Sequence, residues 1–201
     1  MRKGWIKMEN LYLKLAEFNS FHTPRLILRP FQLADAADMF EYSSDSANLE
    51  FIFLPHRSIE ETCLSLANNF MKSPLGKWAI ELKDEKKMIG VLHFIKISEK
   101  NHSAEVGYVL NKAYWRQGLL TEALRTLTEL SFEEFGLKSL ELLIDVENVA
   151  SKRVAEKSGY QLIKVFKAKN QYTGIIRKFE KYELNVLSWD RMTEYLVTNK
   201  K

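Results

Sequence analysis

The chain has 201 residues, of which 46% are hydrophobic and 28% are charged, a composition typical of one soluble globular domain and unlike that of a disordered or fibrous chain. Its formal net charge is +4, and the lysines are interleaved with acidic residues rather than gathered in one block. No basic stripe with stacking aromatic residues is visible, so we expect no nucleic-acid partner, whereas a polyanionic small ligand is compatible with the charge.

The N-terminal segment predicts an amphipathic helix from Trp5 to Phe18, with its apolar residues on one face. Charged residues, Lys7 and Glu9 among them, interrupt any apolar core long enough for a secretion signal, and no run reaches the length of a membrane span. We therefore expect a cytoplasmic protein without a membrane partner. Residues 1–22 are an N-terminal amphipathic helical extension expected to pack on the domain. A dimer contact is the alternative, so the chain is a monomer or a homodimer.

Residues 23–201 are predicted to form a single domain, because no linker or internal repeat interrupts them. In chain order the patterns predict the strand Leu26–Arg29, the helices Ala34–Ser43 and Ile59–Lys72, the strands Trp78–Leu82, Met88–Ile97 and Glu105–Leu110, the helix Leu120–Phe135, the strand Ser139–Ile144, a helix between Asn148 and Gly159, and the strands Tyr160–Lys167 and Ile175–Val186. This order predicts an α/β (α+β) fold with helices on both faces of a mixed sheet. The two strands that flank the helix Leu120–Phe135 form a βαβ unit and run parallel.

Cysteine and histidine usage limits the chemistry. Cys63 is the single cysteine, so an intramolecular disulfide framework is excluded. It falls inside a helical pattern, where a small core residue is the expected role. The four histidines are His22, His56, His93 and His102. They show no metal-ligand spacing with Cys63 or with each other, so we expect no metal.

The turn around Gly118 is the first candidate site. It joins the strand Glu105–Leu110 to the helix that begins near Leu120, and such a turn leaves several backbone N–H groups unpaired at the positive end of the helix dipole. That arrangement binds phosphate. Alone the signal is weak, because one glycine makes neither GxGxxG nor GxxxxGK[ST], and an ordinary strand-to-helix connection explains it equally well.

Two other segments complete a pattern with this turn. The run Tyr114–Ala123 contains the turn, the strand Glu105–Tyr108 precedes it, and the run Asp145–Tyr160 follows a later apolar strand. In this order and spacing the three segments closely resemble the GNAT acyltransferases, and more narrowly the branch that contains the ribosomal-protein N-terminal acetyltransferases. The resemblance extends from Thr23 to Asn185.

The resemblance implies the GNAT fold, a mixed, mostly antiparallel twisted sheet with two splayed parallel central strands that hold the pantetheine arm. It also implies acetyl-CoA as co-substrate, no metal, and an amine acceptor that enters from the opposite face. The residues implied to bind acetyl-CoA are Tyr108, Val109, Leu110, Arg116, Gln117, Gly118, Leu119, Leu120, Thr121 and Asn148. N–H groups around Tyr108 and Val109 are implied to bind the oxyanion, and the turn the pyrophosphate. Asn148 bonds the pantetheine amide, caps its helix, or does both.

Three positions depart from the family pattern. Trp115 stands where the family has Gln or Arg, and Leu120 where it has Gly or Ala. Because backbone N–H groups hold the phosphates, both changes are tolerable, although Leu120 can crowd the pyrophosphate. Ala155 stands where many members carry a tyrosine that protonates the leaving thiolate, so we expect the proton donor elsewhere.

Acetyl transfer needs a base for the ammonium, N–H donors for the oxyanion and a proton for the thiolate. Glu105, at the start of the strand beside the pantetheine, is the candidate base, acting directly or through water. A structural hydrogen bond or ion pair is the alternative. Ser151 resembles the serine of the ribosomal-protein branch and is the candidate proton donor, with helix-end hydrogen bonding as the alternative.

The segment from residue 45 to residue 57 is expected to wall the acceptor site. Asp45 and Glu50 are candidates to hold a cationic amine, and Phe51 and Phe53 are candidates to line an apolar slot. The alternative is that both acids lie on a solvated face and that both phenylalanines belong to the core. This segment therefore does not identify the acceptor.

Three functions remain open. The first is acetyl-CoA-dependent N-acetylation of a primary amine at a protein or peptide N-terminus, such as that of a ribosomal protein. The hairpin Lys169–Ile175, rich in peptide-bonding groups and without acids, suits a peptide backbone, although an ordinary polar turn has the same composition. The second is transfer to a small amine, such as a polyamine, an amino sugar or an aminoglycoside. The third is a non-catalytic acyl-CoA-binding module, and fold resemblance alone does not decide among them.

Overall fold

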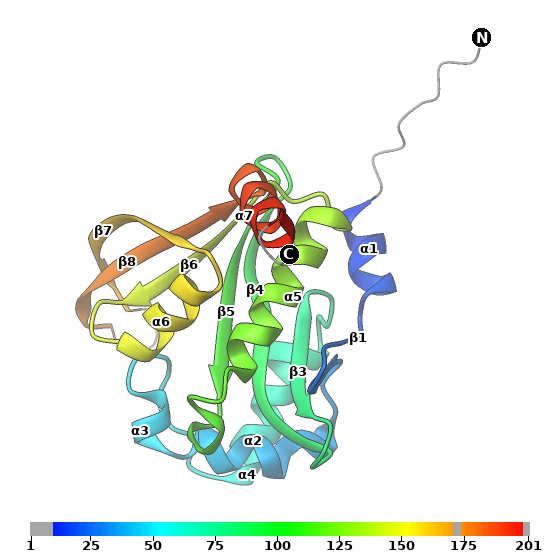
Figure 1. Cartoon of the computed structure of the whole chain (residues 1–201). Coiled ribbons are helices and arrows are strands. Elements are labelled where there is room, and N and C mark those ends of the chain that lie inside the picture. The colour runs from blue at the N-terminus through cyan, green and yellow to red at the C-terminus, as the bar shows by residue number, and fades with distance from the viewer. Residues whose placement is uncertain (1–9, 171–173, 199–201) are drawn as a thin grey trace.

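The computed structural model describes residues 10–170 and 174–198. Figure 1 shows these residues as one sheet with helices on both of its faces. The α-helices are α1 (Leu11–Glu17), α2 (Ala36–Ser43), α3 (Ser46–Leu49), α4 (Ile59–Ser65), α5 (Leu119–Glu133), α6 (Val149–Lys157) and α7 (Val186–Thr198), and a π-helix, Leu66–Met71, continues α4. The strands are β1 (Phe21–His22), β2 (Leu26–Arg29), β3 (Lys77–Leu82), β4 (Lys87–Ser98), β5 (Ser103–Leu110), β6 (Ser139–Asp145), β7 (Gln161–Lys169) and β8 (Ile176–Asn185).

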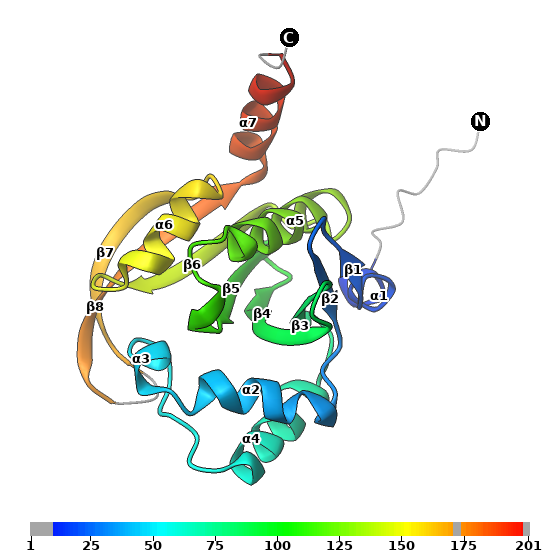
Figure 2. The same ribbon diagram turned by 60° about the horizontal axis from the view of Figure 1, so that its bottom comes forward.

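The strands form a single 8-stranded sheet in the order β1-β2-β3-β4-β5-β6-β8-β7. Neighbouring strands are antiparallel except for β5 and β6, which run parallel. A parallel pair needs a crossover connection, and α5 supplies it between these two strands. The predicted fold class is confirmed, because the sheet is mixed and mostly antiparallel, with helices on both faces (Figures 1 and 2).

The parallel pair β5 and β6 is joined only at its beginning. Its register pairs Ser103 with Ser139 and continues only as far as the pair formed by Glu105 and Glu141. Beyond those residues the two strands separate. In β4, a register shift opposite the same part of β5 marks a bulge, which bends the strand. The opening between the ends of β5 and β6 is the feature that positions the site.

Each face of the sheet has its own core. Leu124 and Leu127 of α5 are fully buried in the first core, and Tyr42 of α2 is 2% exposed in the second. Residues of β5 alternate between the two, because Val106 belongs to the first core and Val109 to the second. Glu105 lies four residues before Val109 in the same strand, and every second side chain of a strand lies on the same face. The Glu105 side chain therefore faces the side of α2 and α4.

The sequence predicts neither α7 nor α3. The strand predicted to reach Val186 ends one residue earlier, and α7 begins there, with Trp189 8% exposed against Phe132 of α5. This contact joins residues that are distant in the sequence, so local pattern does not reveal it. α3 has only four residues, too few for a periodic signal, and begins where the Asp45 side chain accepts a hydrogen bond from the Ala47 N–H at 2.9 Å.

The N-terminal helix is described from Leu11, while residues 1–9, which hold the first part of the predicted helix, lie outside the described residues. Leu15 is fully buried, and Leu11 and Phe18 pack against the same core. α1 therefore packs on the domain, as expected, although the division of the chain at residue 22 stays a prediction. Within the described ranges, no helix combines the length and the apolar character needed to cross a membrane.

Candidate active site

A cavity of about 1760 Å³ lies between the separated ends of β5 and β6 and continues toward α3, α4 and β7. It brings together nearly all the residues that the sequence singles out. Those that line it are Glu105, Tyr108, Val109, Leu110, Arg116, Gly118, Leu119, Leu120, Thr121, Asn148 and Ser151. Gln117, by contrast, is not among the lining residues.

The turn before α5 has the geometry of an anion site. Gly118 has a φ of 77° and Arg116 a φ of 63°, so two residues of this short turn are in the left-handed region. The first hydrogen bond within the helix runs from the Glu122 N–H to the Gly118 carbonyl at 3.0 Å. The N–H groups before Glu122 thus precede the helical ladder and stand at the positive end of the dipole. The turn can hold a phosphate without any basic side chain.

A bracing network fixes this turn from behind. The Arg25 guanidinium donates from Nη1 to the Gln117 carbonyl at 2.9 Å and from Nε to Glu122 Oε2 at 2.7 Å. Thr23 Oγ1 donates to Glu122 Oε1 at 2.5 Å. Because the carbonyl and the next N–H of a trans peptide point in opposite directions, the Gly118 N–H points away from Arg25. Gln117 therefore contributes through its backbone, on the side away from the cavity.

Two of the departures from the family pattern are absorbed by packing. The Trp115 indole Nε1 donates to the Leu110 carbonyl at 2.8 Å, which ties the turn to the end of β5. Leu120 is 9% exposed and belongs to the core beneath α5. Most of its side chain is therefore directed into the core, so the backbone of the turn remains open to a ligand.

Glu105 lies where β5 and β6 begin to separate. Among the described residues its carboxylate makes no hydrogen bond and no ion pair. Burial raises the pKa of Glu105 above its usual value, and the neighbouring Glu141 raises it further, while Lys96 and Lys181 oppose the change. A half-buried carboxylate that faces a cavity without a partner is suited to accept a proton.

Asn148, Ser151 and Tyr108 meet where the cavity reaches α6. The Asn148 side chain accepts from the Ser151 N–H at 3.0 Å, so it caps the helix. The Tyr108 hydroxyl lies 2.7 Å from Ser151 Oγ and 3.3 Å from the Ser151 carbonyl. Burial raises the pKa of the Tyr108 phenol, so the phenol stays protonated and can donate a hydrogen bond. Sequence reasoning considered only the backbone of Tyr108 and missed its side chain, because the pair is 43 residues apart.

His93 is a second cavity residue that the sequence reasoning did not select. It pairs with Gly107 across β4 and β5, and a Cβ placed on Gly107 would come within 2.7 Å of the His93 Nε2. Only glycine leaves room for this ring. Burial lowers the pKa of His93 to about 4, with Lys77 as the second cause, so its imidazole is neutral at physiological pH.

The segment after α3 and the strand β8 wall the side of the cavity where the sequence predicts the acceptor. Arg177 of β8 lies 5.5 Å from the centre of the Phe51 ring and donates to the carboxylates of Asp145 and Glu147. Glu50, Phe51 and Phe53 line the cavity, and Phe53 also packs against the second core, while Asp45 is engaged as the cap of α3. Of the predicted hairpin, Lys169 and Asn170 line the cavity. Gln171, Tyr172 and Thr173 lie outside the described residues.

Metal-ligating side chains do not gather in the part of the chain that the structure describes. His56 Nδ1 lies 2.9 Å from Thr62 Oγ1, and Cys63 packs against the second core.

Comparisons with known proteins agree with this geometry. A family model described as an acetyltransferase (GNAT) domain matches residues 25–161. The N-acetyltransferase YnaD of Bacillus subtilis is 32% identical over 146 residues, 72% of this chain and 84% of that protein. The ribosomal-protein-serine acetyltransferase of Escherichia coli is 30% identical over 108 residues, 53% of this chain and 60% of that protein. The crystal structure of a GNAT-family acetyltransferase from Bacillus anthracis has a TM-score of 0.74 at 26% identity and covers 83% of this chain and 98% of that one.

Proposed function

Because the chain belongs to the GNAT acetyltransferase family, we propose that the amine it acetylates with acetyl-CoA is the N-terminus of a protein or peptide. Acetyl-CoA-dependent transfer follows from the family, and the identity of the acceptor is the proposal. The observation that carries it is the long acceptor side of the cavity, which runs from Glu105 past Phe51 to β7 and β8. That length suits an extended chain better than a small molecule.

The charges on the acceptor side support a peptide over a polyamine. Asp145 and Glu147 are both held by Arg177, and Glu61 accepts a hydrogen bond from the Arg57 N–H at 2.7 Å. These three carboxylates are engaged and offer little to a second ammonium group, which leaves Glu50 and Glu105 as the acidic lining residues available to an amine. The relative from Escherichia coli, named a ribosomal-protein-serine acetyltransferase, points the same way.

Acetyl-CoA fits the opposite half of the cavity. The N–H groups of the turn around Gly118 are placed for its pyrophosphate, because the φ of Gly118 and the bracing by Arg25 set their direction. The separated strands β5 and β6 leave backbone groups of Tyr108 and Val109 without a partner on β6, and these groups suit the pantetheine and the oxyanion. Asn148, which caps α6 through its oxygen, keeps its amide N–H₂ for the pantetheine.

The side chains supply the proton transfers. Glu105 accepts a proton from the acceptor ammonium, directly or through water, and the free amine then attacks the thioester carbonyl. As the tetrahedral intermediate collapses, the C–S bond breaks and Ser151 gives its hydroxyl proton to the departing thiolate. The Tyr108 hydroxyl lies 2.7 Å from Ser151 Oγ. In the proposed relay the phenol is the donor, so the serine proton is free to point at sulfur; the phenol proton then restores the serine, and solvent returns a proton to Tyr108. Here the phenol of β5 serves where many relatives use a tyrosine at the position of Ala155.

An acceptor panel tests the proposal. Release of free CoA from acetyl-CoA is measured with peptides of varied N-terminal residue, with spermidine, with an amino sugar and with an aminoglycoside. We expect peptides to give the highest kcat/KM, and mass spectrometry to place the acetyl group on the α-amine. The matched control is the same peptide with a blocked N-terminus and a free lysine, which should be inert. A small amine that exceeds every peptide by a large factor would overturn the peptide assignment and leave acetyl transfer intact.

A further inference from the structure

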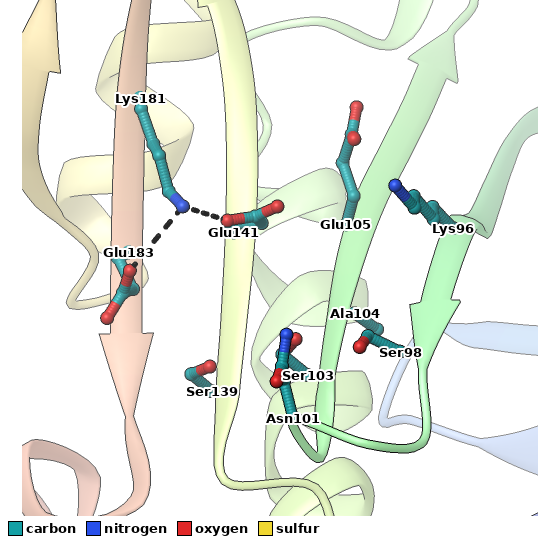
Figure 3. Close-up of a pocket in the computed structure, with 10 residues that line it drawn as sticks. All are labelled: Lys96, Ser98, Asn101, Ser103, Ala104, Glu105, Ser139, Glu141, Lys181 and Glu183. Atoms are coloured by element: carbon teal, nitrogen blue, oxygen red, sulfur yellow. Dashed lines mark ion pairs between the residues drawn. The ribbon is translucent and has the colours of Figure 1, made fainter.

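A second, smaller cavity of about 420 Å³ lies on the same face of the sheet, over the paired beginnings of β5 and β6. Figure 3 shows its lining, which is almost entirely polar and comes from β4, β5, β6 and β8. Lys96 and Glu105 line both this cavity and the larger one. The carboxylate of Glu105 therefore faces the acceptor side and, beneath it, a group of charged side chains that take no part in the transfer itself.

The register of the sheet aligns three carboxylates in this group. Glu105 pairs with Lys96 on one side and with Glu141 on the other, and Glu141 pairs in turn with Glu183. Like charges directly opposite each other on neighbouring strands destabilise a sheet. An acidic row of this kind needs a compensating cation.

Lys181 is that cation, and it pairs with two of the three carboxylates, those of Glu141 and Glu183. Its Nζ forms an ion pair with Glu141 and lies 3.7 Å from Glu183. In Figure 3 the Lys181 ammonium stands between these two carboxylates, with Glu105 on the far side of Glu141. The hydrogen bond to Glu141 raises the pKa of Lys181 above its usual value, so Lys181 stays charged in any assay near neutral pH.

We propose that Glu141 and Lys181 are positioning residues whose ion pair sets the charge beside Glu105 and thereby the pH range in which Glu105 accepts a proton. The inference rests on the proposed role of Glu105 as the base. Glu141 acts as a neighbouring negative charge that favours the protonated form of Glu105, and Lys181 limits this effect by neutralising Glu141. Neither residue touches the reacting atoms.

The directions of the electrostatic effects agree with this arrangement. After burial, Glu141 is the neighbour that raises the pKa of Glu105, while Lys96 and Lys181 lower it. Glu183 lies one strand further away, behind Glu141 and against Lys181. The charged groups that face Glu105 in this cavity are thus Lys96 from β4, Glu141 from β6, and Lys181 and Glu183 from β8.

Two substitutions should move the acid limb of the kcat/KM profile in opposite directions. Glu141→Gln removes a negative charge and lowers the pKa of Glu105, so activity persists to lower pH. Lys181→Met removes a positive charge and leaves Glu141 uncompensated. The pKa of Glu105 then rises, so the loss of activity on acidification begins at a higher pH. At the separation of adjacent strands, near the surface, each shift should be about 0.5 to 1 pH unit. Glu183→Gln, the matched control, makes the same chemical change one strand further away and should shift the limb by less.

A spectroscopic titration separates this inference from the proposed function. The carboxyl carbon of Glu105 is followed by NMR in glutamate-labelled protein and assigned by its absence in Glu105→Gln. We expect its midpoint to fall in Glu141→Gln and to rise in Lys181→Met, in step with the kinetic limbs. Midpoints that stay within about 0.2 units of the wild-type value in both variants would overturn the tuning role. Midpoints that move while the kinetic limbs stay fixed would support the tuning role and remove Glu105 as the base.

Discussion

Gly118→Val tests the cofactor site at a single backbone position. Gly118 has a φ of 77°, a region that a β-branched residue reaches only with strain. A Cβ at this position would meet only the Arg25 Nη2, at 3.7 Å. The fold therefore has space for the substitution, and the expected damage falls on the ligand, because a valine that resists positive φ changes the direction of the N–H groups in the turn.

The structure separates two contributions to the effect. Left-handed backbone at a non-glycine residue costs roughly 1 to 2 kcal/mol of unfolding free energy, which lowers Tm by about 2 to 4 °C for each kcal/mol in a chain of this size. Loss of one charge-assisted hydrogen bond from the turn to the pyrophosphate costs about 1.5 to 3 kcal/mol of binding free energy. That loss raises the Kd for acetyl-CoA by about 10- to 100-fold.

Calorimetric titration with acetyl-CoA measures the second contribution, and thermal unfolding measures the first. Gly136→Val is the matched control, because Gly136 follows the same helix, has a φ of 66°, and has no atom within 4 Å of the position that a Cβ would take. It should lose similar stability and keep normal affinity. Equal affinity of Gly118→Val and wild type would refute the placement of the pyrophosphate. An equal loss of affinity in both variants would assign the effect to destabilisation.

Two further predictions concern proton transfer. Glu105→Gln should lower kcat by about 100-fold while sparing the affinity for acetyl-CoA. Because the pKa of Glu105 is raised, the base form is lost as pH falls through that raised value, so the wild-type acid limb should lie above pH 4.5 and vanish in the variant. A limb that survives in the variant would assign it to another group. Ser151→Ala should lower kcat by about 10- to 100-fold at unchanged acetyl-CoA affinity, and adding Tyr108→Phe should cost little more, because the two hydroxyls act in one chain. Fully additive losses in the double variant would contradict the relay.

Several parts of the site were predictable because they are local. The turn at Gly118 needs positive φ, which only glycine adopts without strain, so the sequence marks it directly. Asn148 as a helix cap is likewise a short-range hydrogen bond, to Ser151 three residues on. The parallel relation of β5 and β6 follows from the helix between them, since such a connection leaves little choice of direction.

The remaining features depend on contacts between distant segments. Tyr108 and Ser151 are 43 residues apart, and their hydroxyls meet because α6 packs beside the open end of β5. Glu105, Glu141 and Glu183 form a row only through the register of three strands, which no single segment of sequence encodes. The helix α7 is stabilised by the packing of Trp189 on Phe132 and replaces the last residue of a predicted strand. The sequence by itself thus determined the local conformations at Gly118 and Asn148 and the family. The tertiary structure decided which side chains share charge and protons, because those energies depend on distances across strands rather than along the chain.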